Sequence, residues 1–365
     1  MNKGVRFRIY PNKEQKNLID QTFGCCRLVY NKGLAMRSDA YKSGEKTGYN
    51  QTSAMLTSLK KQEDFVFLKS VDSIALQQTL RDLDKGFVNF FQKRAKYPVF
   101  KSKHHNFQSY RTLNQGGNVR IVGKYLKLPK LGYVKVRQSM EIDKINNVTV
   151  ERLPSGKYFA VLNVEFEPVP KKNNGGTIGI DVGIKDFYSD SNGNVITNPK
   201  YLEKSLKKLK REQRKLSKKE IGSKNREKQR QKVALVHEKI SNQRNDFLQK
   251  QSTMLIRENQ TICIEDLKIR NMMRNHKLAQ HIASVSWSRF FTMLEYKALW
   301  YGCDVIKVPT TYPSSQTCHV CGYQNPIVKN LAVRKWNCPE CASVHDRDKN
   351  ASLNILQKGL LMQVV

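Results

Sequence analysis

The chain has 365 residues, too many for one ordinary domain, so we expect two or three. Lysine and arginine number 65 against 31 aspartate and glutamate, and this net charge of +34 predicts a polyanionic partner, most simply nucleic acid. A membrane surface is the alternative, but the charge is spread along the whole chain and no run approaches the ~20 apolar residues that span a bilayer. Residues 1–10 lack an apolar signal-peptide core, so we expect a cytosolic protein with no membrane partner.

The N-terminal segment begins as a strand and continues as helices. Residues 4–10 alternate apolar and basic side chains, which predicts a half-exposed strand that Pro11 ends. Apolar residues at helical spacing predict three helices, over residues 14–38, 50–68 and 72–93. Asp72 is placed to cap the third helix. Residues 12–104 are therefore expected to form a small helical domain.

Between residues 107 and 168 the apolar period changes from that of a helix to that of a strand. Short strands separated by turns at Gly132 and Gly156 predict a small antiparallel β module, which we interpret as a barrel. The N-terminal strand would pair with this module, so the helical domain interrupts a β-domain. Residues 168–176 contain two prolines and two glycines, a composition typical of a linker.

The C-terminal half carries the pattern of an α/β domain with a mixed sheet. Residues 177–187 predict a buried strand, with isoleucine and valine on one face and Asp181 on the other. Gly179 and Gly183 remove side-chain bulk beside this aspartate, as expected where a ligand approaches the backbone. A turn follows at residues 190–194. Further elements are expected as two basic helices within 201–251 separated by Gly222, strands at 261–267 and 304–308, and helices at 286–301 and 346–356.

The two basic helices have two possible interpretations. A lysine-rich helical pair can be a solvated, coiled-coil-like arm. Because the whole chain has such a large positive charge, we favour a role in binding phosphates.

Four of the eight cysteines form two Cys-x-x-Cys pairs near the C-terminus. Sixteen residues separate the pairs, a spacing typical of a zinc site. The expected ligands of one structural Zn²⁺ are Cys318, Cys321, Cys338 and Cys341. Four thiolates leave no open coordination position, so this zinc is not expected to be catalytic, and His319 is expected to be a bystander.

Three acidic residues are candidates for a second metal site. Asp181 lies in a buried strand, Glu265 ends another, and Asp348 opens the last helix, so one sheet could bring them together. Three converging carboxylates would hold two Mg²⁺ ions about 4 Å apart for phosphodiester hydrolysis. Three unrelated structural acids are the alternative, and the neighbours Asp266 and Asp346 are also possible ligands.

Six motifs along the chain resemble those of the TnpB family of transposon-encoded RNA-guided DNA nucleases, relatives of the type V CRISPR effectors. They are RFRIYP (6–11), GIDVGIKD (179–186), EDL (265–267), PSSQTCHVCG (313–322), NLAVR (330–334) and HDRDKNA (345–351). The resemblance covers essentially the whole chain. It selects Asp181, Glu265 and Asp348 as the catalytic acids, over Asp266 and Asp346.

The resemblance implies a multidomain α+β fold with an RNase H-like (RuvC) nuclease domain. A wedge β-barrel (residues 1–11 and 105–174) would be interrupted by a helical recognition domain (12–104). The nuclease domain (175–312 and 345–365) would be interrupted by a zinc ribbon (313–344).

The resemblance also implies the partners and the reaction. A guide RNA made from the transposon end would pair with target double-stranded DNA, beside a short motif that the protein reads. By position, the candidates for motif reading are Tyr49, Ser73, Gln77 and Gln115. We expect one protein per RNA, with a dimer as the alternative, acting at the nucleoid of a prokaryotic cell. A nuclease-inactive RNA-guided regulator and a DNA transposase are the competing functions, and the intact set of acids disfavours the regulator.

Overall fold

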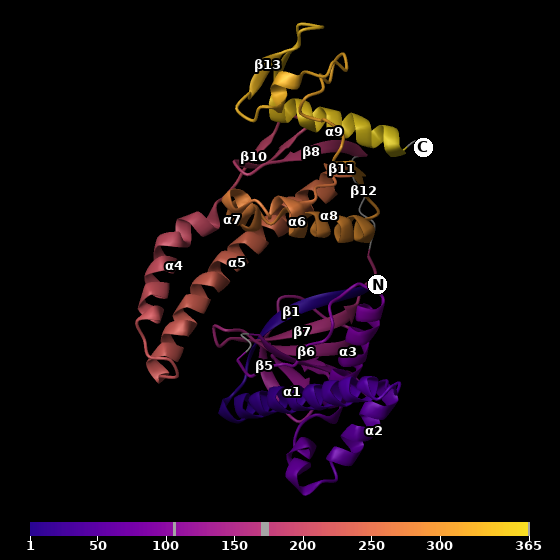
Figure 1. Cartoon of the computed structure of the whole chain (residues 1–365), viewed down its shortest axis with the longest axis vertical. Helices are drawn as coiled ribbons and strands as arrows, with labels where there is room; N and C mark the ends of the chain where they lie inside the picture. The colour runs from indigo at the N-terminus through magenta and orange to yellow at the C-terminus, as the bar shows by residue number, and fades with distance from the viewer. Residues whose placement is uncertain (105–106, 169–174, 364–365) are drawn as a thin grey trace. The chain divides into compact units, whose positions relative to one another are not determined.

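The structure of the protein is a computed structural model that describes residues 1–104, 107–168 and 175–363 (Figure 1). The chain forms two compact units. Unit 1 comprises Met1–Glu167 and Gly222–Ala234, and unit 2 comprises Pro168–Ile221 and Leu235–Val365. Most of the predicted linker (168–176) lies outside the described residues. Among the helices that are described, none combines the length and apolar character needed to cross a membrane.

Unit 1 contains one antiparallel sheet of seven strands. In chain order they are β1 (Asn2–Tyr10), β2 (Gln108–Leu113), β3 (Arg120–Val122), β4 (Tyr125–Leu128), β5 (Gly132–Arg137), β6 (Ile145–Arg152) and β7 (Tyr158–Glu165). The order across the sheet is β2-β6-β7-β1-β5-β4-β3, so the N-terminal strand pairs with the later strands as predicted. The sequence predicted a closed barrel, but within the described residues no pairing joins the outer strands β2 and β3, so the sheet is open.

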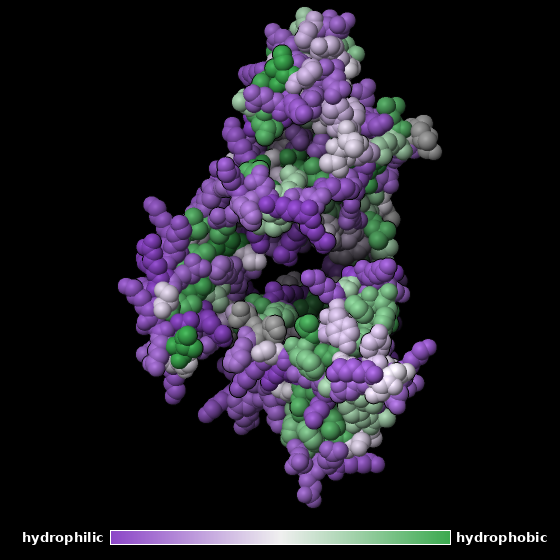
Figure 2. All heavy atoms as spheres, viewed as in Figure 1, coloured by the Kyte–Doolittle hydropathy of each residue, from purple (hydrophilic) through white to green (hydrophobic). Residues whose placement is uncertain are grey.

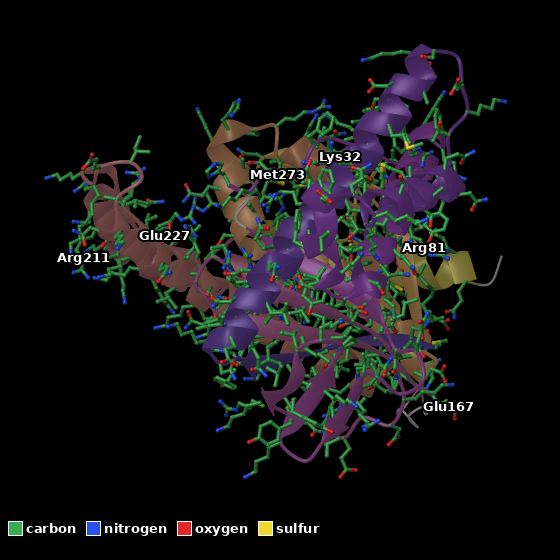
Figure 3. The ribbon with its side chains drawn as sticks, turned by 90° about the horizontal axis from the view of Figure 1, so that it is seen from below. Lys32, Arg81, Glu167, Arg211, Glu227 and Met273 are labelled. Atoms are coloured by element: carbon green, nitrogen blue, oxygen red, sulfur yellow. The ribbon has the colours of Figure 1, made fainter. Side chains whose placement is uncertain are left out.

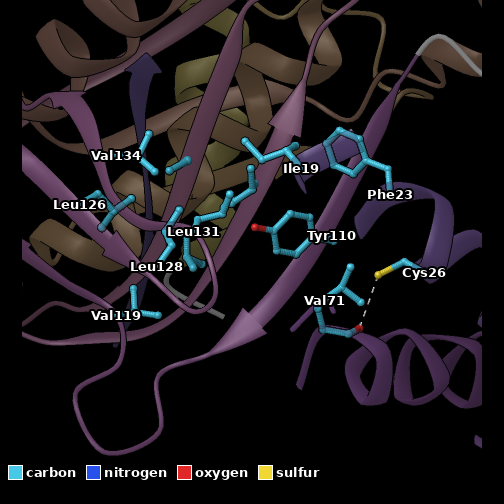
Figure 4. Close-up of a cluster of buried hydrophobic side chains, with 14 of the residues drawn as sticks. Ile19, Phe23, Cys26, Val71, Tyr110, Val119, Leu126, Leu128, Leu131 and Val134 are labelled. Atoms are coloured by element: carbon cyan, nitrogen blue, oxygen red, sulfur yellow. Dashed lines mark hydrogen bonds between the residues drawn. The ribbon is translucent and has the colours of Figure 1, made fainter. Parts of the chain in front are cut away.

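Helices pack on this sheet between β1 and β2 in the chain. They are α1 (Lys13–Lys42), α2 (Tyr49–Leu59), the 3₁₀ helix η1 (Glu63–Lys69) and α3 (Ser73–Phe91). Asp72 caps α3 as predicted, because its Oδ1 accepts a hydrogen bond from Ile74 N at 3.0 Å. Figure 4 shows Ile19 and Phe23 of α1 beside Tyr110 of β2 and the aliphatic side chains of the sheet. The helices and the sheet of unit 1 therefore share one core.

Unit 2 is built on a mixed sheet of five strands. They are β8 (Gly176–Val182), β9 (Asp186–Asp190), β10 (Val195–Thr197), β11 (Asn259–Glu265) and β12 (Asp304–Val308). The order is β10-β9-β8-β11-β12, with β11 parallel to both β8 and β12. The predicted strand over 177–187 is divided by a turn after Val182. Gly183 permits this turn, since a Cβ there would lie 2.8 Å from the carbonyl oxygen of Asp186.

The helices that follow β10 in the chain are α4 (Tyr201–Ser217), α5 (Lys224–Glu258), α6 (Ile269–Met272), α7 (His276–Val285), α8 (Trp287–Tyr301) and α9 (Arg347–Gln363), and the residues of α5 up to Ala234 belong to unit 1. Helices α5, α7 and α8 cover one face of the sheet, and α9 covers the other. Ile178, Ile180, Ile262 and Ile264 share one core with residues of α5, α7 and α8, whereas Cys263 packs with Ile355 of α9. Asp181 lies on the α9 face by strand alternation.

Two glycines allow α9 to lie directly on the sheet. A Cβ on Gly179 of β8 would lie 2.1 Å from the carbonyl oxygen of Ser352, and one on Gly359 of α9 would lie 2.3 Å from Cys263 Sγ. The space at Gly179 is thus filled by the backbone of α9, and the expectation that a ligand occupies it is wrong. This close packing places the first turn of α9 at the carboxyl ends of β8 and β11.

Lys297 of α8 is a buried lysine in this helical layer. Its Nζ donates hydrogen bonds to the carbonyl oxygen of Gln249 (3.0 Å), Ser252 Oγ (2.7 Å) and Thr253 Oγ1 (2.7 Å). Burial lowers its pKa to about 8. Between pH 8 and the ordinary lysine pKa, the unfolded chain binds more protons than the folded chain, so this residue makes stability rise with pH.

We expect Lys297→Met to remove this rise. The free energy of unfolding of the wild type, relative to the variant, should increase by about 2 kcal/mol between pH 8 and 10. Urea unfolding at several pH values measures the free energy of unfolding of both proteins. Lys277→Met, at an exposed position of α7, is the control and should keep the pH dependence of the wild type. A parallel pH dependence for wild type and Lys297→Met would contradict the assignment.

Candidate active site and metal centre

The three predicted acids line one cavity of about 270 Å³ in unit 2. Asp181 lies at the carboxyl end of β8, and Glu265 is the last residue of the parallel strand β11. Asp348 lies in the first turn of α9. The cavity is also lined by Ser314, Arg334 and Arg347. Three elements that are distant in sequence therefore deliver carboxylates to one place.

Each carboxylate has a different environment. Glu265 Oε1 accepts a hydrogen bond from Ser314 Oγ at 2.6 Å. Both oxygens of Asp348 accept hydrogen bonds from Arg334 Nη1, at 3.3 and 3.2 Å. Asp181 is half-buried on the sheet, opposite Ser189 of β9. Arg334 thus partly neutralises the charge of Asp348. For Asp181 no ion pair is seen among the described residues, so its charge is set by burial and by the nearby charged groups.

The electrostatics of the cavity suit a cation. Burial and the negative charges of Glu265 and Asp348 raise the pKa of Asp181 well above its ordinary value, against the opposing effect of Arg347 and Arg334. Burial also raises the pKa of Glu265, and the bond from Ser314 counteracts it. A divalent cation bound by oxygen ligands would relieve this repulsion, so the residues present fit Mg²⁺.

The two alternative acids lie elsewhere. Asp346 Oδ1 accepts hydrogen bonds from the backbone N–H groups of Asp348 (3.2 Å) and Lys349 (3.1 Å), so Asp346 caps α9. Asp266 forms an ion pair with Lys268. Neither residue lines the cavity of the three acids. The geometry therefore favours Asp348 and Glu265 over their neighbours.

The four predicted zinc ligands converge in the segment between β12 and α9. This segment holds η2 (Pro326–Lys329) and the two-stranded sheet of β13 (Lys335–Asn337) and β14 (Val344–Asp346). The ligand sulfurs of Cys318, Cys321, Cys338 and Cys341 all lie within 4.8 Å of one another. Two of the separations, Cys318–Cys341 and Cys321–Cys338, are 3.6 Å.

This arrangement fits zinc. Zn–S bonds of about 2.3 Å in a tetrahedron place the sulfurs about 3.8 Å apart. Within the described residues, the four thiols form the only group of three or more histidine, cysteine or acidic side chains close enough together to hold a metal ion, and the three acids do not form such a group.

Two histidines lie beside this centre, and sequence reasoning missed one of them. His345 is buried, and its Nε2 lies 3.1 Å from Cys318 Sγ. His319 Nδ1 lies 2.9 Å from Asn350 Oδ1, so its ring contacts α9. The position of His345, four residues after Cys341, is the signal that could have identified it.

The four candidates for motif reading lie in unit 1. Ser73 and Gln77 are exposed, one turn apart at the start of α3, and Gln115 is exposed in the loop after β2. Tyr49 begins α2, and the guanidinium of Arg81 lies 4.4 Å from its ring centroid. Arg81 follows Gln77 by four residues, so it lies one turn further along the same face of α3.

Three family models match this chain. Residues 160–276 match the model described as a probable transposase (OrfB_IS605), and residues 287–355 match a Cas12f1-like TNB domain. Residues 1–46 match a helix-turn-helix domain. In the structure, residues 1–46 contain one strand, β1, and one helix, α1.

Two relatives and one solved structure resemble the chain along its length. A "Putative RNA-guided DNA endonuclease" of Streptomyces pristinaespiralis is 42% identical over 363 residues, which cover 98% of this chain and 89% of the relative. The "Putative RNA-guided DNA endonuclease InsQ" of Escherichia coli (strain K12) is 32% identical over 375 residues, which cover 98% and 92%. Cas12f1, solved in a complex with sgRNA and target DNA, matches with a TM-score of 0.58 at 13% identity, covering 97% of this chain and 98% of Cas12f1.

The fold is therefore of the Cas12f1 type, with a C-terminal module that holds four clustered thiols. Both relatives exceed 30% identity over nearly the whole chain. The chain belongs to the TnpB family, as its motifs predicted.

Proposed function

We propose that the protein is an RNA-guided DNA endonuclease that cleaves double-stranded DNA by Mg²⁺-dependent phosphodiester hydrolysis. The observation that carries the proposal is the convergence of Asp181, Glu265 and Asp348 on one cavity. The names of the two relatives support the same activity. The guide would be a transposon-derived RNA, and the target would be selected beside a short DNA motif.

Each residue of the cavity would have a separate role in the reaction. The three carboxylates would hold two Mg²⁺ ions, which would supply the activation of water and the stabilisation of the leaving oxygen. Arg334 and Arg347 place positive charge where a phosphodiester would enter. Ser314 fixes one oxygen of Glu265. The four cysteines hold a structural Zn²⁺ outside this chemistry.

The domain assignment is part of the proposal. Residues 1–11 and 105–174 would form the wedge domain, and 12–104 the helical recognition domain. The RuvC-like nuclease domain would comprise 175–312 and 345–365, with the zinc ribbon at 313–344. Strands β8, β9 and β10 as an antiparallel meander, continued by parallel β11 and β12, support an RNase H-like sheet.

A row of basic side chains on α4 supports a polyanionic partner. A cavity of about 410 Å³ is lined by Lys207, Lys210, Arg211, Arg214, Lys215 and Lys218. Successive members of this set are alternately three residues and one residue apart, which places all of them on one face of the helix over a length of about 16 Å. Glu212 pairs with two of them, Arg211 and Lys215, which leaves a net positive row. Figure 3 shows Arg211 among many nitrogen-tipped side chains on α4, and Figure 2 shows hydrophilic side chains there. We propose that this row binds guide RNA phosphates.

Base recognition would lie in unit 1. Tyr49, Ser73 and Gln77, with Gln115 in the loop after β2, would read the target-adjacent motif. Side-chain amides and hydroxyls of this kind pair with base edges in the major groove.

Plasmid cleavage by the purified protein–RNA complex tests the function. The copurified RNA is sequenced first, and a plasmid is then built with a matching target and a randomised flanking segment. Linear product that requires both the guide match and Mg²⁺ is expected. Because one family model is described as a probable transposase, joined DNA products are also sought, and their appearance would favour strand transfer.

A further inference from the structure

The segment Ser314–His319 lies between the two candidate metal centres and contacts both. Cys318 is one of the four clustered thiols. Ser314, four residues earlier, is buried and donates its hydroxyl hydrogen to Glu265 Oε1 at 2.6 Å. Ser314, which is hydrogen-bonded to the candidate catalytic acid Glu265, therefore belongs to the same short segment as the zinc ligand Cys318.

The same segment is bonded to the helix of Asp348. Asn354 Nδ2 donates to the carbonyl oxygens of Ser314 (2.8 Å) and Thr317 (2.6 Å). Asn350 Nδ2 donates to the same Thr317 oxygen at 2.7 Å. Asn350 Oδ1 accepts a hydrogen bond from the backbone N–H of His319 at 3.1 Å.

The hydrogen bonds of Asn350 and Asn354 fix the position of the segment Ser314–His319 relative to α9. Asn350 and Asn354 are each 1% exposed, so their hydrogen bonds are protected from water. Asn350 lies two residues after Asp348 on α9. A displacement of the segment would therefore move Glu265 through Ser314 and Asp348 through Asn350.

We propose that Ser314 is a positioning residue for the metal-binding carboxylates, and that the zinc ribbon sets the relative position of Glu265 and Asp348 through the segment Ser314–His319. The inference rests on the proposed nuclease function. The Ser314 hydroxyl holds Oε1 of Glu265, and Glu265 lines the cavity, so Oε2 is the oxygen that would bind a cation there. Hydrogen-bond partners of this kind typically change metal affinity or activity by about 10- to 100-fold when they are removed.

Ser314→Ala, measured in the complex with guide RNA, tests the proposal. We expect the half-saturating Mg²⁺ concentration for cleavage to rise about 10-fold, and the affinity for Mn²⁺, measured by electron paramagnetic resonance, to fall to a similar degree. Zinc content, melting temperature and guide RNA binding should stay at wild-type values. Ser314→Thr, which keeps the hydroxyl, should restore most of the metal affinity.

Ser43→Ala is the matched control, because the exposed Ser43 hydroxyl donates to the Asp39 carbonyl oxygen at the end of α1, outside both metal centres and outside the basic row of α4. Wild-type metal affinity in Ser314→Ala would overturn the positioning role while leaving the nuclease function intact. Loss of zinc or of melting temperature in Ser314→Ala would assign Ser314 a merely structural role. A wild-type complex that neither cleaves DNA nor binds Mn²⁺ would overturn the proposed function, and the positioning role with it.

Discussion

Replacing Asp181 with alanine is expected to abolish DNA cleavage while leaving guide RNA binding unchanged. Burial and the charges of Glu265 and Asp348 raise the pKa of Asp181, so a bound cation would be needed to keep this carboxylate charged beside the other two. Its removal should lower the cleavage rate by about 1,000-fold or more, equal to about 4 kcal/mol of transition-state stabilisation. Guide-directed plasmid cleavage and a gel-shift assay with the guide RNA measure the two properties.

The chain offers matched controls for this experiment. Glu265→Gln and Asp348→Asn should lose cleavage, whereas Asp266→Asn and Asp346→Asn should retain it. Asp346→Asn keeps an oxygen that can cap α9, and Asp266 is paired with Lys268 outside the cavity. Cleavage retained by Asp181→Ala, or lost equally in the two neighbours, would reject the site assignment.

Removal of zinc is expected to unfold the C-terminal ribbon. The ribbon holds only short elements, which are η2, β13 and β14, with a small core around Cys318, Val328, Trp336 and Cys338. A core of this size depends on its metal, and structural zinc contributes about 10–16 kcal/mol of apparent binding free energy in zinc-finger peptides. Chelation, or Cys338→Ser, should lower the melting temperature and speed amide hydrogen exchange across 313–344.

Metal analysis provides the control for this prediction. The wild type should carry one zinc per chain, Cys338→Ser should carry none, and Cys303→Ala should keep it, because Cys303 is a buried thiol outside the cluster. Unchanged melting and hydrogen exchange after complete zinc removal would contradict a structural role.

Local patterns were sufficient to predict many of the elements. The apolar stripe of α3 and its cap at Asp72 are encoded by neighbouring residues, so their periodicity identifies the helix. The pairing of β1 with the later β module was predicted, but the structure was needed to identify its partners as β5 and β7. Helix α7 was not predicted, although the sequence contains its signals. Asn275 caps the helix, and Ile282 and Val285 face the core.

Tertiary packing determined what could not be predicted. The sequence placed Asp181, Glu265 and Asp348 on suitable elements, but their meeting depends on the close approach of α9 that Gly179 and Gly359 permit. The bond from Ser314 to Glu265 joins residues 49 positions apart. No periodic pattern marks such a contact, because it arises only when β11, the ribbon and α9 are assembled.

Anomalous diffraction from crystals of the guide RNA and target DNA complex, grown with Mn²⁺, tests the central claim most directly. The account predicts two manganese peaks about 4 Å apart, ligated by Asp181, Glu265 and Asp348. Crystals that show no manganese at these three carboxylates, or manganese bound at other acids of the chain, would contradict it.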